Sequence, residues 1–265
     1  MIKTLADRVR ITLEDGIAEV ALIRPDKMNA LDADTFDAIC EASELLAALP
    51  ELRAVIFYGE GPAFCAGLDV SLMSQPEAIG DLTERSHGIC NRYQQAAWGW
   101  HQLPVPVLAA ISGPCIGGGL QIALGADLRI VHPEATFCVM EIQWGLIPDM
   151  GFTQLAPKLM REDVVRDLMF SGRKITGSEA QNLGLATSLA VDPLAEARVY
   201  ARELANKSPD AIRAAKRLVN SSSDDIAKGL MAESQAMASL FNSANQREAV
   251  MARLQKRPPE FSDPK

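Results

Sequence analysis

The chain has 265 residues, of which 48% are hydrophobic and 23% are charged, a balance typical of a globular protein with a large core. Its formal net charge of -8 argues against the basic surface that nucleic-acid binders need, so no nucleic-acid partner is expected. No stretch reaches the ~18 consecutive apolar residues of a membrane span.

The N-terminal part of the chain shows strand, helix and strand patterns in turn. Two β-rich runs flank Asp15-Gly16, a strong two-residue turn signal, and predict a hairpin over residues 8–25. Residues 32–50 have apolar positions at helical spacing and end in a proline, which predicts a helix up to that proline. A short buried strand is expected over 53–59.

Two loops in the next part of the chain carry glycine and small residues after a buried strand. The loop 60–69 follows the strand just described and leads into a short helix. Residues 81–102 have a helical pattern, and another buried strand is expected over 105–113. The glycine run Gly117–Gly119 comes after this strand and opens a further helix. Both loops therefore share one plan of strand, tight turn and helix.

The pattern changes beyond residue 150. Two more short strands are predicted within 126–139, and after residue 150 strand signals nearly vanish. Helices are expected over residues 152–159, 162–170, 178–183, 193–206, 209–220, 225–241 and 246–256. This order predicts an α/β core followed by an all-helical C-terminal layer.

Cysteine and histidine give no sign of disulfides or of a metal site. The five cysteines form no CxxC pair, and their odd number is typical of reduced thiols in a cytoplasm-like compartment. The N-terminus lacks the uninterrupted apolar segment of a secretory signal, so a cytoplasmic location is expected. The three histidines share no metal-ligand spacing, and no metal is expected.

The glycine run can serve either binding or packing. A strand–glycine–helix corner aims backbone N–H groups at one point, where a phosphate or an oxyanion can bind. No Lys-Ser/Thr follows the glycines, and Ile122 stands where a dinucleotide fingerprint needs glycine, which argues against a phosphate. Close packing of strand and helix explains this run alone equally well. Together with the loop 61–69, two facing corners would give one carbonyl oxygen two N–H donors, as in an oxyanion hole suited to a thioester.

Six stretches of the sequence resemble one known family. They are RPDKMNALD (24–32), GPAFCAGLD (61–69), PVLAAISGPCIGGGLQIALGAD (106–127), MEIQWGLIPDMGFTQL (140–155), SGRKITGSEAQNLGL (171–185) and QREAVMARLQKRPPEF (246–261). In this order, and over nearly the whole chain, they look like the crotonase superfamily, which is the enoyl-CoA hydratase/isomerase family.

The resemblance implies an α/β fold built as a spiral of ββα units, with an all-helical C-terminal trimerisation region. Residues 1–195 would form the core with the CoA-thioester site, and residues 196–265 the oligomerisation region. A homotrimer or a dimer of trimers is expected, without a membrane partner. The substrate would be an acyl-CoA thioester; CoA is then part of the substrate, and no separate cofactor is expected.

The resemblance also assigns backbone groups to the thioester. The N–H groups of Ala66 and Gly118 would form the oxyanion hole. The CoA moiety would be lined, mostly through the backbone, by Asp26, Lys27, Met28, Ala66, Gly67, Leu68, Asp69 and Gly118. The wall of the acyl pocket is expected within residues 70–100, where no motif reveals the acyl group.

The chain departs from the family at one catalytic position. Hydratases of this family use two glutamates, and the corresponding positions here hold Gln121 and Glu141. Gln121 can hydrogen-bond a water or the substrate, or pack against backbone, but an amide cannot take and return a proton at neutral pH. Losing a positioned acid or base costs ~10²–10⁴-fold in rate. Efficient hydration by two carboxylates is therefore not expected.

Asp149 is a further candidate catalytic residue. Hydratases tend to carry a small residue at this place, whereas the dienoyl-CoA isomerase branch has an acidic one. That branch also has Asp at the position of Gln121, so the match is partial. The alternative is that Asp149 caps the apolar helix that follows it.

These residues favour isomerisation of a double bond. Glu141 alone can remove a proton from one carbon and return it to another, while the oxyanion hole holds the dienolate. Two alternatives stay open. One is an enoyl-CoA hydratase in which Gln121 holds the water, and the other is a CoA-thioester binder without catalysis.

Overall fold

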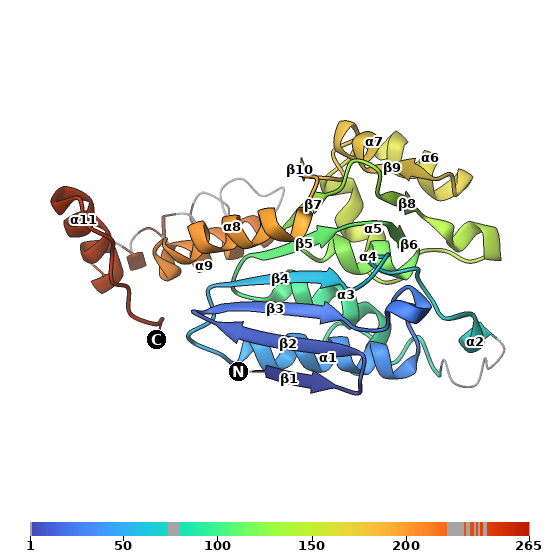
Figure 1. Cartoon of the computed structure of the whole chain (residues 1–265), viewed down its shortest axis with the longest axis horizontal. Coiled ribbons are helices and arrows are strands. Elements are labelled where there is room, and N and C mark those ends of the chain that lie inside the picture. Colours follow the sequence, from blue (N-terminus) through green and yellow to red (C-terminus); the bar gives the residue numbers. More distant parts are fainter. Residues whose placement is uncertain are drawn as a thin grey trace.

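The computed structural model describes residues 2–73, 80–221 and 243–264, together with 231, 234, 235, 237, 239 and 240. Its centre is a seven-stranded sheet with the order β1-β2-β3-β4-β5-β7-β10, and a three-stranded sheet has the order β6-β8-β9 (Figure 1). The strands are β1 (Ile2–Leu5), β2 (Val9–Glu14), β3 (Ile17–Leu22), β4 (Ala54–Gly59), β5 (Val107–Ile111), β6 (Pro114–Ile116), β7 (Leu128–Val131), β8 (Thr136–Cys138), β9 (Ile175–Thr176) and β10 (Ser188–Leu189). The helices are α1 (Ala33–Ala47), α2 (Val70–Met73), α3 (Arg92–Gln102), α4 (Gly118–Leu124), α5 (Phe152–Leu155), α6 (Glu162–Ser171), α7 (Gly177–Asn182), α8 (Pro193–Ala205), α9 (Pro209–Asn220) and α11 (Ala244–Gln255), with short 3-10 turns η1 (Pro25–Lys27), η3 (Met140–Trp144) and η4 (Ala156–Lys158).

The parallel strands of the large sheet send their following loops to one edge. The predicted hairpin is confirmed, because β2 and β3 pair antiparallel around Asp15 and Gly16, whose φ angles are 50° and 75°. Two consecutive positive φ angles are what a tight hairpin turn needs. From β3 onward, β4, β5 and β7 are parallel neighbours. The loops after β3 and β4, and the segment after β5 that leads through β6 to the glycine corner, therefore leave from the carboxyl ends of the parallel strands, where open α/β sheets place their ligand sites.

Helices cover both faces of the large sheet (Figure 1). On one face α1 and α3 share a core with β4, and Trp100 of α3 stacks on Phe57 with ring centroids 4.9 Å apart. On the other face α8 packs Ala197 and Ala201 against β4 and β5. The boundary expected after residue 195 therefore falls inside a helix that belongs to the sheet core.

The helix expected over 81–102 is shorter than its pattern. It begins only after Asn91, whose side chain accepts the N–H of Gln94 at 2.8 Å while the Gln94 side chain accepts the N–H of Asn91 at 3.1 Å. This reciprocal capping box starts a helix at that point. The first half of the prediction, residues 81–91, is wrong, since these residues form turns, a bend and an isolated bridge between His87 and Cys90.

The other helix predictions agree with the structure where it describes them. The helix expected up to Pro50 is α1, and its N-cap Asp32 accepts the N–H of Thr35 at 2.9 Å. Helices follow residue 150 as expected, although the short strands β9 and β10 had no clear sequence signal. The helix predicted over 225–241 lies largely outside the described residues. Within the described part of the chain, no helix is both long and apolar enough to cross a bilayer.

Candidate active site

The glycine corner joins β6 to α4 and leaves room for a carboxylate. Gly117 is the N-cap of α4 and has φ 51° and ψ -121°, a conformation that glycine adopts readily. A Cβ built there would lie 3.4 Å from Oε1 of Glu141. The N–H of Gly117 also donates to the carbonyl of Cys138 at 2.9 Å, which ties the corner to the end of β8 just before Glu141. The glycine run thus brings the start of α4 against the predicted catalytic glutamate.

Gln121 and Glu141 are in direct contact. Gln121 is 2% exposed, and its Nε2 donates to Oε1 of Glu141 at 2.7 Å. The N–H of Met150 donates to Oε1 of Gln121, also at 2.7 Å. Because the amide oxygen accepts this hydrogen, the amide nitrogen is the end that faces the carboxylate. Gln121 therefore orients Glu141, a role that the sequence alone did not reveal.

The second carboxylate oxygen of Glu141 has a different environment from the first. Oε2 is buried and has no hydrogen-bond partner among the described residues. Burial raises the pKa of Glu141 above its ordinary value of 4.5, the hydrogen bond from Gln121 opposes the rise, and the negative charge of Asp149 adds to it. A carboxylate with a raised pKa and a free oxygen is a stronger base than an exposed glutamate.

Asp149 lies close enough to influence the same site. Its charge raises the pKa of both Glu141 and Tyr93, while desolvation raises the pKa of Asp149 itself. The N-cap of the following helix α5 is Gly151, and no side chain caps that helix. The explanation of Asp149 as an N-cap is therefore wrong. Asp149 is exposed as a residue, although burial of its carboxyl group raises the pKa of that group.

The two glycine-containing loops lie side by side, as the sequence predicted. Cys65 forms an isolated parallel bridge with Cys115, in which the N–H of Cys65 donates to Pro114 at 3.0 Å. A Cβ built on Gly67, whose φ is 90°, would lie 3.7 Å from the backbone nitrogen of Gly118. Backbone groups of both loops therefore meet at the start of α4.

The donor predicted at Ala66 is wrong. The N–H of Ala66 donates to the carbonyl of Met28 at 2.9 Å and is not free for a ligand. Leu31 makes a parallel bridge to Leu68: it donates to the carbonyl of Gly67 at 2.8 Å, and its carbonyl accepts the N–H of the residue after Leu68 at 3.0 Å. In such a bridge the N–H of Leu68 points away from Leu31.

Leu68 and Gly118 are thus the unoccupied donors of the two loops. Neither backbone N–H has an acceptor among the residues that the structure describes. Leu68 was predicted to line CoA but not to be a donor, because only the long-range bridge to Leu31 shows which N–H is free.

The remaining candidates lie around these loops. Asp26 and Lys27 form the exposed turn η1, and the neighbouring Met28 is 47% exposed. Of the region 70–100 expected to wall the acyl pocket, residues 74–79 lie outside the described residues. Burial raises the pKa of the Cys65 thiol to about 12, which makes it a poor nucleophile.

Among the described residues, metal-ligating side chains do not come together. In the described ranges, no group of at least three His, Cys, Asp or Glu side chains is arranged to hold a metal ion. All five cysteines are free and buried.

A family model with the description enoyl-CoA hydratase/isomerase matches residues 12–264. The chain belongs to the enoyl-CoA hydratase/isomerase family. Among curated members of this family, the probable enoyl-CoA hydratase echA6 of Mycobacterium tuberculosis is 32% identical over 96% of this chain and 98% of its own length. The enoyl-CoA isomerase/hydratase fer4 of Mycosarcoma maydis is 31% identical over 93% of both chains. The chain is therefore an enzyme of the enoyl-CoA hydratase/isomerase family.

Solved structures of the family share the fold. An enoyl-CoA hydratase from Bacillus anthracis matches with a TM-score of 0.88 and 26% identity, over 96% of this chain and 98% of that chain. A putative enoyl-CoA hydratase from Streptomyces coelicolor matches with the same TM-score of 0.88 and 29% identity, over 96% of this chain and 94% of that chain. The predicted crotonase-type α/β fold is confirmed.

Proposed function

We propose that this enzyme moves a double bond within an acyl-CoA thioester, from the 3 to the 2 position, with Glu141 as the proton carrier. The proposal is supported above all by the contact between Gln121 and Glu141. That contact leaves one buried, unpartnered carboxylate oxygen, and it puts an amide where a second acid or base would be needed.

The thioester oxygen is held by the N–H groups of Leu68 and Gly118. Neither has an acceptor among the described residues, they come from adjoining loops, and Glu141 lies next to the glycine corner that carries Gly118. Two backbone donors stabilise the negative charge that develops on the oxygen when the neighbouring carbon loses a proton. Ala66 takes no part as a donor, because Met28 occupies its N–H. The CoA moiety runs past η1 and residues 66–69.

The reaction needs one carboxylate and no other reactant. Oε2 of Glu141 takes a proton from C2 of the 3-enoyl thioester, and the electron pair of that C–H bond becomes part of a dienolate with its charge on the thioester oxygen. Glu141, now protonated, returns the proton to C4. The double bond then lies between C2 and C3, in conjugation with the carbonyl group. The raised pKa of Glu141 suits both halves, since the group must act as base and then as acid.

Hydration of a 2-enoyl thioester is the second candidate. It is favoured by the curated relatives, among which are proteins named enoyl-CoA hydratase and enoyl-CoA isomerase/hydratase. In that reaction Glu141 activates the water, but the amide of Gln121 cannot act as the acid that supplies a proton to the substrate. The third candidate, a thioester binder without turnover, gives no role to the buried, unpartnered Oε2 of Glu141. The trimer or hexamer and the cytoplasmic location stay predictions.

Two substrates offered to the same enzyme separate these candidates. We expect 3-hexenoyl-CoA to be converted to the conjugated 2-enoyl product faster than crotonyl-CoA is hydrated. The conjugated product absorbs where the substrate does not, so both rates can be followed by absorbance. Hydration as the faster reaction would show that the site is a hydratase, and binding without either reaction would show a thioester binder.

A further inference from the structure

The N–H of Leu68, which has no acceptor among the described residues, lies in a loop that is hydrogen-bonded to the segment 24–32. Three backbone hydrogen bonds join the two segments. The N–H of Ala66 donates to the carbonyl of Met28, the N–H of Leu31 to that of Gly67, and the N–H of Asp69 to that of Leu31. None of them involves the N–H of Leu68. The direction of that N–H therefore depends on how firmly the segment 24–32 is held.

Backbone hydrogen bonds form the turn of this segment, such as the one from the N–H of Asn29 to the carbonyl of Arg24 at 2.9 Å, and side chains add to them. Met28 and Asn29 have positive φ angles of 49° and 56°; asparagine tolerates this left-handed conformation, whereas methionine adopts it rarely. Arg24 stabilises the turn in two ways. Its backbone N–H donates to Oδ1 of Asn29 at 2.9 Å, and Nη1 of its guanidinium group donates to the carbonyl of Ala30 at 3.1 Å.

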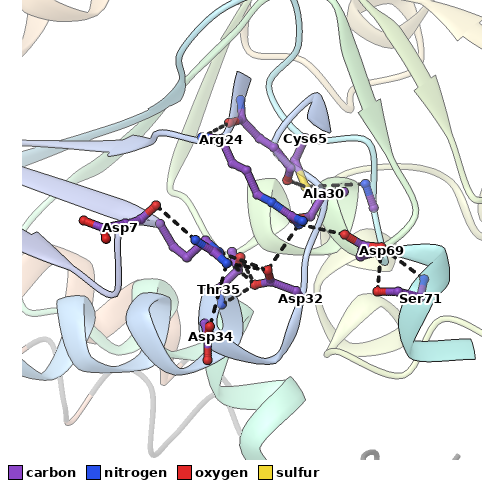
Figure 2. A network of polar contacts seen from close by, with 12 residues as sticks. Asp7, Arg24, Ala30, Asp32, Asp34, Thr35, Cys65, Asp69 and Ser71 are labelled. Carbon is purple, nitrogen blue, oxygen red and sulfur yellow. Dashed lines mark hydrogen bonds and ion pairs between the residues drawn. The ribbon is translucent and has the colours of Figure 1, made fainter. Parts of the chain in front are cut away.

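The same guanidinium reaches across to the other loop. Nη1 of Arg24 lies 2.7 Å from Oδ2 of Asp69, the residue directly after Leu68, and 3.3 Å from Oδ2 of Asp32 (Figure 2). The side chains of Arg24 and Asp69 are only 20% and 14% exposed. The other oxygen of Asp69 accepts the N–H and the hydroxyl of Ser71 at 3.0 and 2.8 Å. Both oxygens of Asp69 are thus fixed, and a partly buried pair is screened less than a surface pair.

We propose that Arg24 is a positioning residue for the reaction: by holding Asp69 and Ala30 together, it aims the N–H of Leu68 at the thioester oxygen. Arg24 itself touches no reacting atom. The inference rests on the proposed function, because it assumes that a thioester carbonyl lies at Leu68. It also goes beyond it, since neither Arg24 nor its pairing with Asp69 is needed to explain the proton transfer by Glu141.

The carbonyl stretch of a bound thioester reports this geometry directly. Butyryl-CoA labelled with ¹³C at C1 has no double bond to move or hydrate, so it can be held at the site during infrared difference spectroscopy. Two N–H donors weaken the C=O bond and lower its frequency. We expect a clear downshift in the wild type and a smaller one in Arg24→Gln, with Arg24→Lys in between because it keeps the charge but loses the planar fork.

Kinetics provides a second readout. A misdirected N–H weakens binding of the charged intermediate more than binding of the substrate, so Arg24→Gln should lower kcat for 3-hexenoyl-CoA by roughly 10–100-fold with little change in KM. The matched control is Arg8→Gln. Arg8 pairs with Asp32 in the same network, its Nη2 lying 2.9 Å from Oδ2, but it contacts neither Asp69 nor Ala30. Arg8→Gln should keep the wild-type carbonyl frequency.

The outcomes separate the inference from the function on which it rests. An unshifted carbonyl in the wild type overturns the proposed thioester site itself. A downshift that is equal in the wild type and in Arg24→Gln overturns the positioning role and leaves the site intact. Should Arg24→Gln fail to fold, Asp69→Asn tests the same pair while keeping the shape of the side chain. It must then also show a smaller downshift, and an unchanged one contradicts the inference.

Discussion

Nε2 of Gln121 lies 2.7 Å from Oε1 of Glu141, while the Oε1 atom of Gln121 is held by the N–H of Met150. This arrangement fixes which end of the amide meets the carboxylate. The neutral amide lowers the pKa of Glu141 through its hydrogen bond, whereas a second carboxylate at the same distance would raise it. Under the proposed function, the departure from the two-glutamate pattern supports catalysis by Glu141 alone, and it leads to the first prediction.

Gln121→Glu should weaken the proposed isomerisation at neutral pH. Two carboxyl groups at this distance share a proton, so the pKa of Glu141 rises further and less of it is ionised. We expect the acid limb of the kcat/KM profile to move to higher pH and the rate at pH 6 to fall roughly 10-fold or more. Gln154→Glu, at an exposed position on α5, is the control and should keep the wild-type profile. A gain in crotonyl-CoA hydration in Gln121→Glu would instead support the hydratase candidate.

Asp149→Asn should move the acid limb the other way. The negative charge of Asp149 raises the pKa of Glu141, so removing it lets Glu141 ionise at lower pH. Wild-type activity is expected to fall as the pH drops through a value above 4.5, and the variant should retain activity further into that range. The measurement is kcat/KM for 3-hexenoyl-CoA against pH. An unshifted acid limb would show that the two carboxylates do not interact in the working enzyme.

Glu141→Gln should stabilise the fold while it removes activity. The folded-state pKa of Glu141 is raised, so the native state favours the protonated form, and ionisation of Glu141 lowers stability as the pH rises above 4.5. A neutral amide avoids this ionisation cost, for a gain of roughly 1 kcal/mol at pH 7, although its NH2 group then occupies the unpartnered place of Oε2. Urea unfolding of both proteins measures the difference. A less stable variant would mean that the charge of Glu141 is well compensated.

Asp69→Asn should lower stability at neutral pH but not in strong acid. The hydrogen bonds from Ser71, together with Arg24, lower the pKa of Asp69 from 3.8 to about 2. A carboxyl whose folded-state pKa is depressed contributes stability above its unfolded value, and that contribution is lost as the pH falls through about 2. We expect a loss of about 1–2 kcal/mol at pH 7 after screening, which narrows between pH 4 and pH 2. If the difference in unfolding free energy between wild type and Asp69→Asn does not change with pH, the lost stability comes from the shape of the side chain and not from its charge.

Sequence patterns predicted the parts of the fold that depend on neighbouring residues. Asp15-Gly16 encodes its own turn, and Asp32 and the proline after α1 mark the limits of that helix. The glycine run likewise predicted a strand–turn–helix corner. These features depend on local dihedral angles and caps, which short stretches of sequence contain.

The missed features depend on contacts between distant segments. Nothing near Ala66 shows that the carbonyl of Met28 occupies its N–H, so the wrong donor was predicted. The ion pair between Arg24 and Asp69 joins residues 45 positions apart and has no sequence signature. The contact of Gln121 with Glu141 was open for the same reason, although both residues were singled out by their types and motifs.

The most direct test of the account compares wild type with Glu141→Gln in the conversion of 3-hexenoyl-CoA to the conjugated 2-enoyl product. The substitution keeps the size of the side chain and the acceptor for Gln121, and it removes only the ability to carry a proton. The account predicts turnover by the wild type and a loss of ~10²–10⁴-fold in the variant. Equal rates in the two proteins would contradict the role given to Glu141 and with it the proposed reaction.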